Sequence, residues 1–314
     1  MTRGGTAVEG SVEGPAGRPI CSFDELLDAV APLPPLRVAV VGAADVSVLE
    51  GMVEAAEAGI VAPVLVGDGD EVAACAADVP GAEDFEVVHA ADEPAWCDTG
   101  TGLVADGRAD ALVKGHVHTN AFMRPVLRRL RTTTRVSHVF LVELASYPKL
   151  LAITDAAVNI APDLMAKAAI TENAIDLVRR FGVERPKVAA LSAVEVVNPA
   201  IPSTLDAACL AKMADRGQIH DAVVDGPLAF DVAVSAESAR IKGVASPVAG
   251  DVDVLVVPDI DAGNILVKDL EYLAGGSLAG IVVGATAPIV LTSRADPPRS
   301  RLLSCAVAAY AAST

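Results

Sequence analysis

The chain has 314 residues, of which 52% are hydrophobic and only 3% aromatic, so aliphatic side chains must form most of its core. Its formal net charge of -17 at pH 7 repels nucleic acid and anionic membranes, which argues against both as partners. No apolar run reaches the roughly 18 residues of a membrane span, and the N-terminus lacks a basic start followed by an apolar stretch, so we expect a cytoplasmic protein.

The first predicted elements follow a polar N-terminal segment. Residues 1–20 are rich in Gly, Glu and Ser, which predicts a disordered tail. Ser22 and Glu25 then form a capping box, and a helical apolar stripe from Val48 to Ala56 ends at Gly59. Further along, short β-branched runs alternate with Ala-rich helical patterns, which is typical of a parallel sheet with crossover helices. The predicted fold class is α/β.

The predicted strands place several turns of small residues at strand ends. We expect strands at residues 37–41, 63–66, 86–89, 111–113, 139–144, 150–154, 187–191, 222–224, 252–257, 280–283 and 289–291. Turns follow at Gly42 to Asp45, at Lys114 and Gly115, at Asp225 to Pro227, and at Asp259 to Asn264. Ligands of open parallel sheets bind at the carboxyl ends of strands, so we expect these turns to face one cleft. None is a phosphate loop or a dinucleotide fingerprint, which disfavours nucleotide hydrolysis and Rossmann-type redox chemistry.

A window of positive charge follows the fourth predicted strand. No acidic residue occurs between Asp110 and Glu143, although six basic residues do: Lys114, Arg124, Arg128, Arg129, Arg131 and Arg135. Some belong to the solvated face of a helix, and we expect two or three to contact anions. Lys114 to Thr119 combines a cation, a glycine and a hydroxyl, which suits phosphate. His116 and His118 have no third His or Cys beside them, so hydrogen bonding is favoured over metal ligation.

The segment from Val257 to Lys268 carries the signs of a binding turn. Pro258 ends a strand, Gly263 allows backbone to approach a ligand, and Asn264 is suited to cap the helix that follows. A helix start favours anions, while Asp259 and Asp261 can accept from a ligand donor or orient a basic side chain. The alternative is an ordinary capped connection between a strand and a helix.

A second group of reactive side chains follows the last predicted strand, from Thr292 to Asp296. A hydroxyl, a guanidinium and a carboxylate there can bind a phosphoryl group or an oxyanion and move a proton. The alternative is a polar turn with an internal Arg-Asp pair. The segment from Asp225 to Asp231 is open to the same two interpretations. Glu195 and Asn198 follow another strand and are expected to reach the cleft.

In this order, these segments resemble the phosphate acetyl/butyryl transferase family, and its phosphate butyryltransferase branch more than its acetyl branch. The resemblance runs from about residue 22 to the C-terminus. The matching segments are Lys114-Gly115 with Thr119, Leu130-Arg131 with Ser137-His138-Val139, residues 153–162, residues 193–195 with 197–199, residues 225–231, Lys242-Gly243, residues 248–251, residues 257–264 and residues 284–296.

The resemblance implies two α/β domains around a deep cleft, on a scaffold related to isocitrate and isopropylmalate dehydrogenases, usually as a homodimer. Residues 21–150 and 288–314 would form the first domain and residues 151–287 the second. The implied reaction is reversible: acyl-CoA and phosphate give acyl phosphate and CoA, with direct attack of the CoA thiolate on the acyl phosphate. Coenzyme A is thus a substrate, and no permanently bound cofactor or metal is implied. Butyryl-like chains are favoured, with acetyl as the alternative.

The resemblance also implies roles for individual residues. Ser293 and Arg294 align with the serine and arginine that the acetyl branch uses in catalysis, whereas the position of that branch's aspartate base is Ser300 here. Asp296 fits the butyryl-branch pattern and is the leading candidate base. The candidate substrate-binding residues are Lys114, Thr119, Arg131, Ser137, Asn159, Glu195, Asn198, Asp225, Gly226, Asp231, Asp259, Gly263 and Asn264.

Two other functions stay open at this point. A non-catalytic sensor of acyl-CoA or acyl phosphate would have been free to lose Ser293 and Arg294. A metal-dependent dehydrogenase on the same scaffold would need an aspartate cluster, and the sequence offers only Asp259 and Asp261.

Overall fold

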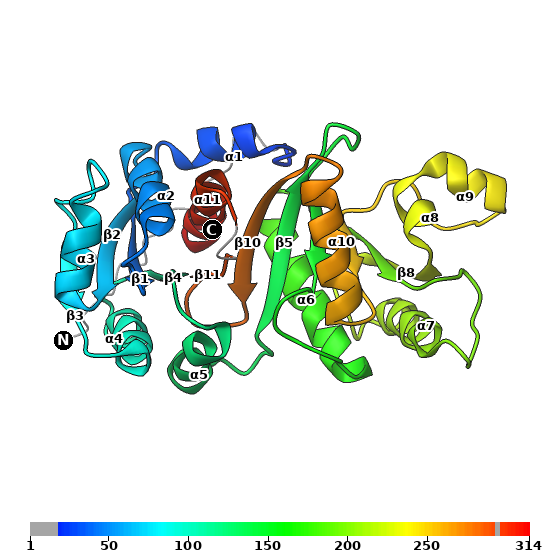
Figure 1. Cartoon of the computed structure of the whole chain (residues 1–314). Coiled ribbons are helices and arrows are strands. Elements are labelled where there is room, and N and C mark those ends of the chain that lie inside the picture. Colours follow the sequence, from blue (N-terminus) through cyan, green and yellow to red (C-terminus); the bar gives the residue numbers. More distant parts are fainter. Residues whose placement is uncertain (1–17, 293–295) are drawn as a thin grey trace, which may run out of the picture.

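The computed structural model describes residues 18–292 and 296–314 of the chain. Its strands form a single 11-stranded sheet in the order β3-β2-β1-β4-β11-β10-β5-β6-β9-β7-β8, flanked by helices (Figure 1). The strands are β1 (Leu36–Val41), β2 (Val61–Gly67), β3 (Glu86–His89), β4 (Ala111–Lys114), β5 (Ser137–Glu143), β6 (Leu151–Thr154), β7 (Lys187–Leu191), β8 (Val223–Leu228), β9 (Val254–Val256), β10 (Ser277–Val283) and β11 (Ile289–Val290). The helices are α1 (Phe23–Val30), α2 (Val46–Glu57), α3 (Gly69–Ala76), α4 (Glu93–Ala105), α5 (Thr119–Arg129), α6 (Leu164–Arg180), α7 (Pro202–Asp215), α8 (Phe230–Val234), α9 (Ala236–Lys242), α10 (Ile260–Tyr272) and α11 (Pro298–Ser313).

The sheet is mainly parallel, as predicted, but its direction reverses in the middle. β10 pairs antiparallel with both β11 and β5, and β5 pairs antiparallel with β6. The other neighbouring strands pair in parallel. The carboxyl ends of β1 and β4 therefore point opposite to those of β6, β7, β8 and β9.

The two faces of the sheet are packed differently. On one face a continuous hydrophobic core includes Val139 and Leu141 of β5 and is covered by residues of α1, α2, α6, α7 and α11. On the other face, where Phe140 and Val142 lie, there are two separate cores. One is formed with α4 and α5, and the other with α8, α9 and α10. The gap between these two cores lies over the central strands.

The C-terminal segment packs against the N-terminal half of the chain. β11 lies between β4 and β10, and α11 packs on α1 and α2 (Figure 1). The predicted disordered tail of residues 1–20 is wrong at its end, because Ile20 is buried and donates its N–H to the carbonyl of Phe181 at 2.9 Å. Residues 1–17 of that prediction lie outside the described residues. The division into two domains at the predicted boundaries stays a prediction. Among the described residues, no helix has the length and apolar character needed to cross a membrane.

The predicted start of α1 is confirmed. Ser22 is its N-cap and accepts a hydrogen bond from the N–H of Glu25 at 3.1 Å. The Glu25 carboxylate reaches back to the N–H of Cys21, at 2.7 Å, rather than to that of Ser22. The predicted apolar stripe after residue 48 is buried in α2, and Gly59 follows that helix with a φ of +71°. Local capping chemistry thus sets these helix ends.

The predicted turn at Asp225 to Pro227 is wrong, because these residues lie inside β8. The register between β7 and β8 shifts close to this point. β8 is the last strand of the sheet, so a proline there removes no hydrogen bond to a further strand.

The predicted N-cap role of Asn264 at the start of α10 is also wrong. The N-cap is Asp259, whose carboxylate accepts from the N–H of Ala262 at 2.9 Å, and both predicted residues lie within the helix. A Cβ at Gly263 would lie 2.9 Å from the Cβ of Ala156. The missing side chain therefore allows the helix to approach the segment after β6, and the approach of a ligand at Gly263 stays a prediction.

Candidate active site

A cavity of about 800 Å³ lies over Phe140 of β5, where the two cores of the split face separate. We call it the candidate active cavity. Its lining comes from the ends of β4 and β11, the start of α5, one side of α10 and the segment after β6. The lining residues are Lys114, Val117, His118, Thr119, Phe140, Ala156, Ala157, Ile260, Asp261, Asn264, Ile265, Lys268, Leu291, Thr292 and Asp296. Four predicted site residues, Lys114, Thr119, Asn264 and Asp296, are brought together here.

The end of β4 and the start of α5 make one wall suited to anions. Lys114 is buried, and its ammonium lies 3.5 Å from the carbonyl oxygen of Gly115. Gly115 is required sterically, since a Cβ there would lie 2.4 Å from the carbonyl oxygen of Gly42. His118 is the N-cap of α5 and makes no side-chain cap bond within the described part of the chain. The free N–H groups and dipole of a helix start favour a negative ligand.

The opposite wall carries a lysine between two carboxylates. The ammonium of Lys268 lies 3.3 Å from Asp296 and 3.0 Å from Glu271, and 5.4 Å from the centre of the Tyr272 ring. Burial lowers the pKa of Lys268, but the hydrogen bond to Glu271 and the charge of Asp296 outweigh it and raise the pKa overall. Lys268 therefore stays positively charged at neutral pH.

Lys268 ends the predicted binding turn, but no role was predicted for it from the sequence. A usable signal was present, because residues 260, 261, 264, 265 and 268 recur at helical spacing and so share one side of α10. The structure places all five in the cavity lining.

Thr292 was also given no role of its own. Its side-chain oxygen is buried and makes no hydrogen bond to any residue in 18–292 or 296–314, although Thr292 lines the candidate active cavity. A buried hydroxyl without a partner costs stability unless a ligand or water completes it. Ser293 and Arg294, the predicted catalytic pair, lie outside the described residues.

A buried histidine supports the end of β11. His138 has no exposed surface, and its Nε2 lies 3.3 Å from the carbonyl oxygen of Leu291, one residue before Thr292. Burial lowers the pKa of His138, and the nearby charge of Asp155 opposes this only in part. The neutral ring therefore donates from Nε2 to the carbonyl, and its Nδ1 has no partner among the described residues.

Asn159 and Ser137, two predicted binding residues, are engaged inside the protein. The Asn159 amide donates to Asp155 at 2.6 Å and to the carbonyl of Val136 at 3.0 Å. Ser137 is fully buried and accepts from the amide of Asn173 at 2.8 Å. Neither lines the candidate active cavity.

Other predicted site residues lie outside the candidate active cavity. Glu195 and Asp231 come together through Lys242, whose ammonium is 2.9 Å from each carboxylate. Asn198 accepts from the N–H of Ala200 at 3.0 Å, and the carboxylate of Asp225 accepts from the N–H of Gly226 at 2.8 Å. These residues follow or belong to β7 and β8, which lie at the far edge of the sheet.

Arg131 also lies away from the cavity, exposed, where its backbone forms a bridge with Ala285. His116 and His118 have separate partners: His116 lies 3.1 Å from Asp45, and His118 lies 3.1 Å from Glu93. These contacts agree with the hydrogen-bonding roles predicted for the two histidines. In the part of the chain that the structure describes, no group of three or more His, Cys, Asp or Glu residues is placed to hold a metal ion.

Comparison with known proteins identifies the family. Residues 96–309, more than half of the chain, match the sequence family described as Phosphate acetyl/butaryl transferase. The chain belongs to the phosphate acetyl/butyryl transferase family. The phosphate acetyltransferase of Rhizobium meliloti is 47% identical over 298 residues, covering 92% of this chain and 93% of that protein. The phosphate butyryltransferase of Clostridium acetobutylicum is 43% identical over 297 residues, covering 93% and 99%.

A solved structure agrees with this membership. The branched-chain phosphotransacylase from Enterococcus faecalis V583 has a TM-score of 0.78 at 32% identity, covering 88% of this chain and 99% of that one. The predicted resemblance to the family is confirmed, and this member of the phosphate acetyl/butyryl transferase family is an enzyme, a phosphate acyltransferase. The predicted closer likeness to the butyryl branch stays a prediction, since the acetyl- and butyryltransferases named above have similar identities to this chain. The sensor and dehydrogenase alternatives are not supported.

Proposed function

We propose that the chain transfers a short acyl group, butyryl-like in preference, between coenzyme A and inorganic phosphate. The observation that carries this proposal is the position of Thr292 and Asp296. These two residues flank Ser293 and Arg294 in the sequence, and both line the same cavity as Lys114. This arrangement supports the catalytic roles proposed for Ser293 and Arg294.

The proposed reaction needs a base and positive charge close together. A free thiol has a pKa of roughly 8.5, so at neutral pH the CoA thiol must lose its proton to attack well. Asp296 is the proposed base, and its carboxylate is fixed by Lys268 at 3.3 Å. The thiolate attacks the carbonyl carbon of the acyl phosphate, forming the C–S bond. The C–O bond to phosphate then breaks, and Asp296 returns the proton it took from the thiol to the leaving phosphate.

Charge develops on two groups during this step, and the cavity offers a partner for each. Arg294 and Ser293 are proposed to stabilise the oxyanion of the tetrahedral intermediate. Lys114 and the start of α5 near Thr119 are proposed to hold the phosphate. The same contacts serve the reverse reaction, in which phosphate attacks the thioester.

The acyl chain is proposed to lie against the apolar part of the lining. Val117, Phe140, Ile265 and Leu291 supply that surface. Relatives named as acetyl- and butyryltransferases are 47% and 43% identical to this chain, so identity does not indicate the preferred acyl group. We propose that the shape of this apolar surface decides the length of the acyl chain.

The proposal includes a homodimer in the cytoplasm. Several large apolar side chains are exposed after β6 and β7: Ile160 on the loop after β6, Met165 in the first turn of α6, and Val196 and Val197 on the loop after β7. Exposed apolar clusters of this kind mark protein interfaces, so we expect a dimer in sedimentation velocity experiments. All five cysteines are free thiols, which suits a reducing compartment.

The deciding experiment measures CoA release from acetyl-, propionyl-, butyryl- and isobutyryl-CoA with a thiol reagent, with and without phosphate and without added metal. Phosphate-dependent release is expected, fastest with the four-carbon chains. Release independent of phosphate would contradict the reaction, and fastest release from acetyl-CoA would contradict the proposed acyl preference only.

A further inference from the structure

A second cavity, of about 300 Å³, lies at the amino ends of the neighbouring strands β6, β9 and β7. Its apolar wall consists of Ile20, Leu141, Leu150, Val178, Phe181 and Val183. Its charged residues are Lys149, Arg185, Lys187, Asp251 and Asp253. No residue lines both this second cavity and the candidate active cavity. A site here would therefore be separate from the proposed acyl transfer.

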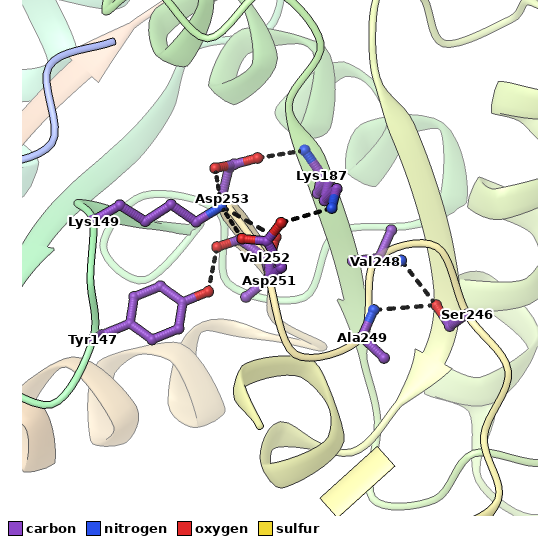
Figure 2. A network of polar contacts seen from close by, with 9 residues as sticks. All are labelled: Tyr147, Lys149, Lys187, Ser246, Val248, Ala249, Asp251, Val252 and Asp253. Carbon is purple, nitrogen blue, oxygen red and sulfur yellow. Dashed lines mark hydrogen bonds and ion pairs between the residues drawn. The ribbon is translucent and has the colours of Figure 1, made fainter. Parts of the chain in front are cut away.

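Four of the charged residues neutralise one another (Figure 2). The ammonium of Lys149 lies 2.8 Å from Asp251 and 2.6 Å from Asp253. The ammonium of Lys187 lies 2.6 Å from Asp251, and its backbone N–H donates to Asp253 at 2.7 Å. The two lysines and two aspartates form a closed network at one side of the cavity, with no net charge.

Arg185 is the remaining charged residue of the lining. It is exposed and makes no hydrogen bond or ion pair with any residue in the described ranges 18–292 and 296–314. Because the other four charges cancel, the lining formed by the described residues carries one positive charge. A ligand with one negative charge would neutralise this positive charge, whereas a dianion would be repelled by the carboxylates of the two aspartates.

We propose that the second cavity binds an aliphatic monocarboxylate. The carboxylate would pair with the guanidinium of Arg185, which presents two N–H donors in a geometry that fits two carboxylate oxygens. The chain would lie against Leu150, Phe181 and Val183. The cavity is near the lower end of the size range of small-molecule sites, roughly 300 to 1,000 Å³, which suits a short chain and excludes a ligand as large as coenzyme A.

The second cavity and the candidate active cavity are connected by two strands, β5 and β6. Leu141 lines the second cavity, and its neighbour on β5, Phe140, lines the candidate active cavity on the opposite face. Leu150 precedes β6 and Ala156 follows it, and they line the second and the candidate active cavity respectively. Since an acyl chain also suits the candidate active cavity, the test must show which cavity holds the carboxylate.

Titration calorimetry of the full chain with hexanoate, with hexanamide as the uncharged match, tests the proposal. Wild-type protein is expected to bind hexanoate. The affinity of Arg185→Gln for hexanoate, and the affinity of wild type for hexanamide, are each expected to be lower by about tenfold or more. Arg216→Gln is the matched control, because Arg216 is exposed at the end of α7 and lies outside the second cavity. Equal binding of hexanoate by Arg185→Gln and wild type would overturn the proposal.

A second measurement uses Cys21, which lines the second cavity and is half-buried. Bound hexanoate is expected to slow its reaction with a maleimide, while exposed Cys209 reacts at an unchanged rate. Val183→Trp, which fills the cavity, should abolish this protection in protein whose circular dichroism is native. Hexanoate binding without protection of Cys21 would place the ligand elsewhere and reject the site.

Discussion

The two cavities use similar charged residues in opposite ways. In the second cavity two lysines and two aspartates close on one another, and only Arg185 is left for a ligand. In the candidate active cavity Lys268 is paired with Glu271 and Asp296, but other polar groups keep capacity for a ligand. The hydroxyl of Thr292 has no partner in the described ranges, and the start of α5 receives no side-chain cap from His118. A site for reversible transfer needs such incomplete groups, since each must bind a different charge as the reaction proceeds.

The largest expected effect comes from removing the proposed oxyanion partner. Arg294→Ala should lower kcat by roughly 10²- to 10³-fold and change the KM for CoA much less, because the charge is matched to the transition state. Initial-rate kinetics at neutral pH measure the split. Arg294→Lys is the matched variant: it keeps the charge but loses the planar donor pair, so an intermediate rate is expected. Unchanged turnover in Arg294→Ala would remove Arg294 from the mechanism.

The charged network of the second cavity should affect stability and leave turnover intact. Lys149→Met leaves the buried carboxylate of Asp253 without its cation and should lower the free energy of unfolding by about 3 kcal/mol. Lys212→Met breaks the exposed pair with Asp215 and should cost less than about 0.5 kcal/mol. Urea unfolding measures both. A similar loss of unfolding free energy in the two variants would show that the network stabilises the protein no more than an exposed ion pair does.

His138 should make stability depend on pH below neutrality. Burial lowers its pKa in the folded protein, so the unfolded chain takes up the proton first as the pH falls below roughly 6.5. Stability is then present above that pH and is lost as the pH falls toward the folded pKa, with a slope of up to about 1.4 kcal/mol per pH unit. His138→Gln should flatten this slope between pH 7 and 5, as measured by urea unfolding.

The control for this prediction is an exposed histidine. His220 has a largely exposed side chain near Glu172, so His220→Gln should keep the wild-type slope. Equal slopes for wild type and His138→Gln would show that His138 does not drive the pH dependence.

Local chemistry predicted the elements better than their directions. The cap of α1 by Ser22 and the α/β fold class follow from side-chain pattern and hydrogen-bonding capacity, and both are confirmed. The reversal of strand direction at β10 and β6 has no local signal, because a buried strand has the same pattern in either direction. The candidate active cavity collects the turns after β4 and β9, although the carboxyl ends of these two strands point in opposite directions. Asp225 is not part of it, because β8 is the last strand of the sheet.

The candidate site was predictable where a residue's role depends on its own segment. Lys114 and Asp296 line the cavity as expected. Asp259 and Asn264 are both good N-cap residues, so residue type does not choose between them, and the structure shows the cap at Asp259. Thr292 could not be singled out from sequence, since only the packed structure shows that its hydroxyl is buried without a partner among residues 18–292 and 296–314.

Thr292→Val gives the smallest expected change and the sharpest test of the comparison. The substitution keeps shape and removes only the hydroxyl. If substrate completes that hydroxyl, kcat/KM should fall by about tenfold, equivalent to one hydrogen bond of roughly 1.4 kcal/mol. Stability should stay equal or rise, because a buried polar group without a partner is removed. Steady-state kinetics and thermal unfolding of the same protein samples measure the two quantities.

The matched control is Thr171→Val. Thr171 is also fully buried, but its hydroxyl donates to the carbonyl of Lys167 at 2.7 Å, so its loss should lower stability by about 1 kcal/mol and leave kcat/KM unchanged. A gain of stability in Thr292→Val with a loss in Thr171→Val would show that the hydroxyl of the candidate active cavity lowers the stability of the protein. A loss of stability in Thr292→Val with unchanged kinetics would instead make this hydroxyl a structural group and remove it from the site.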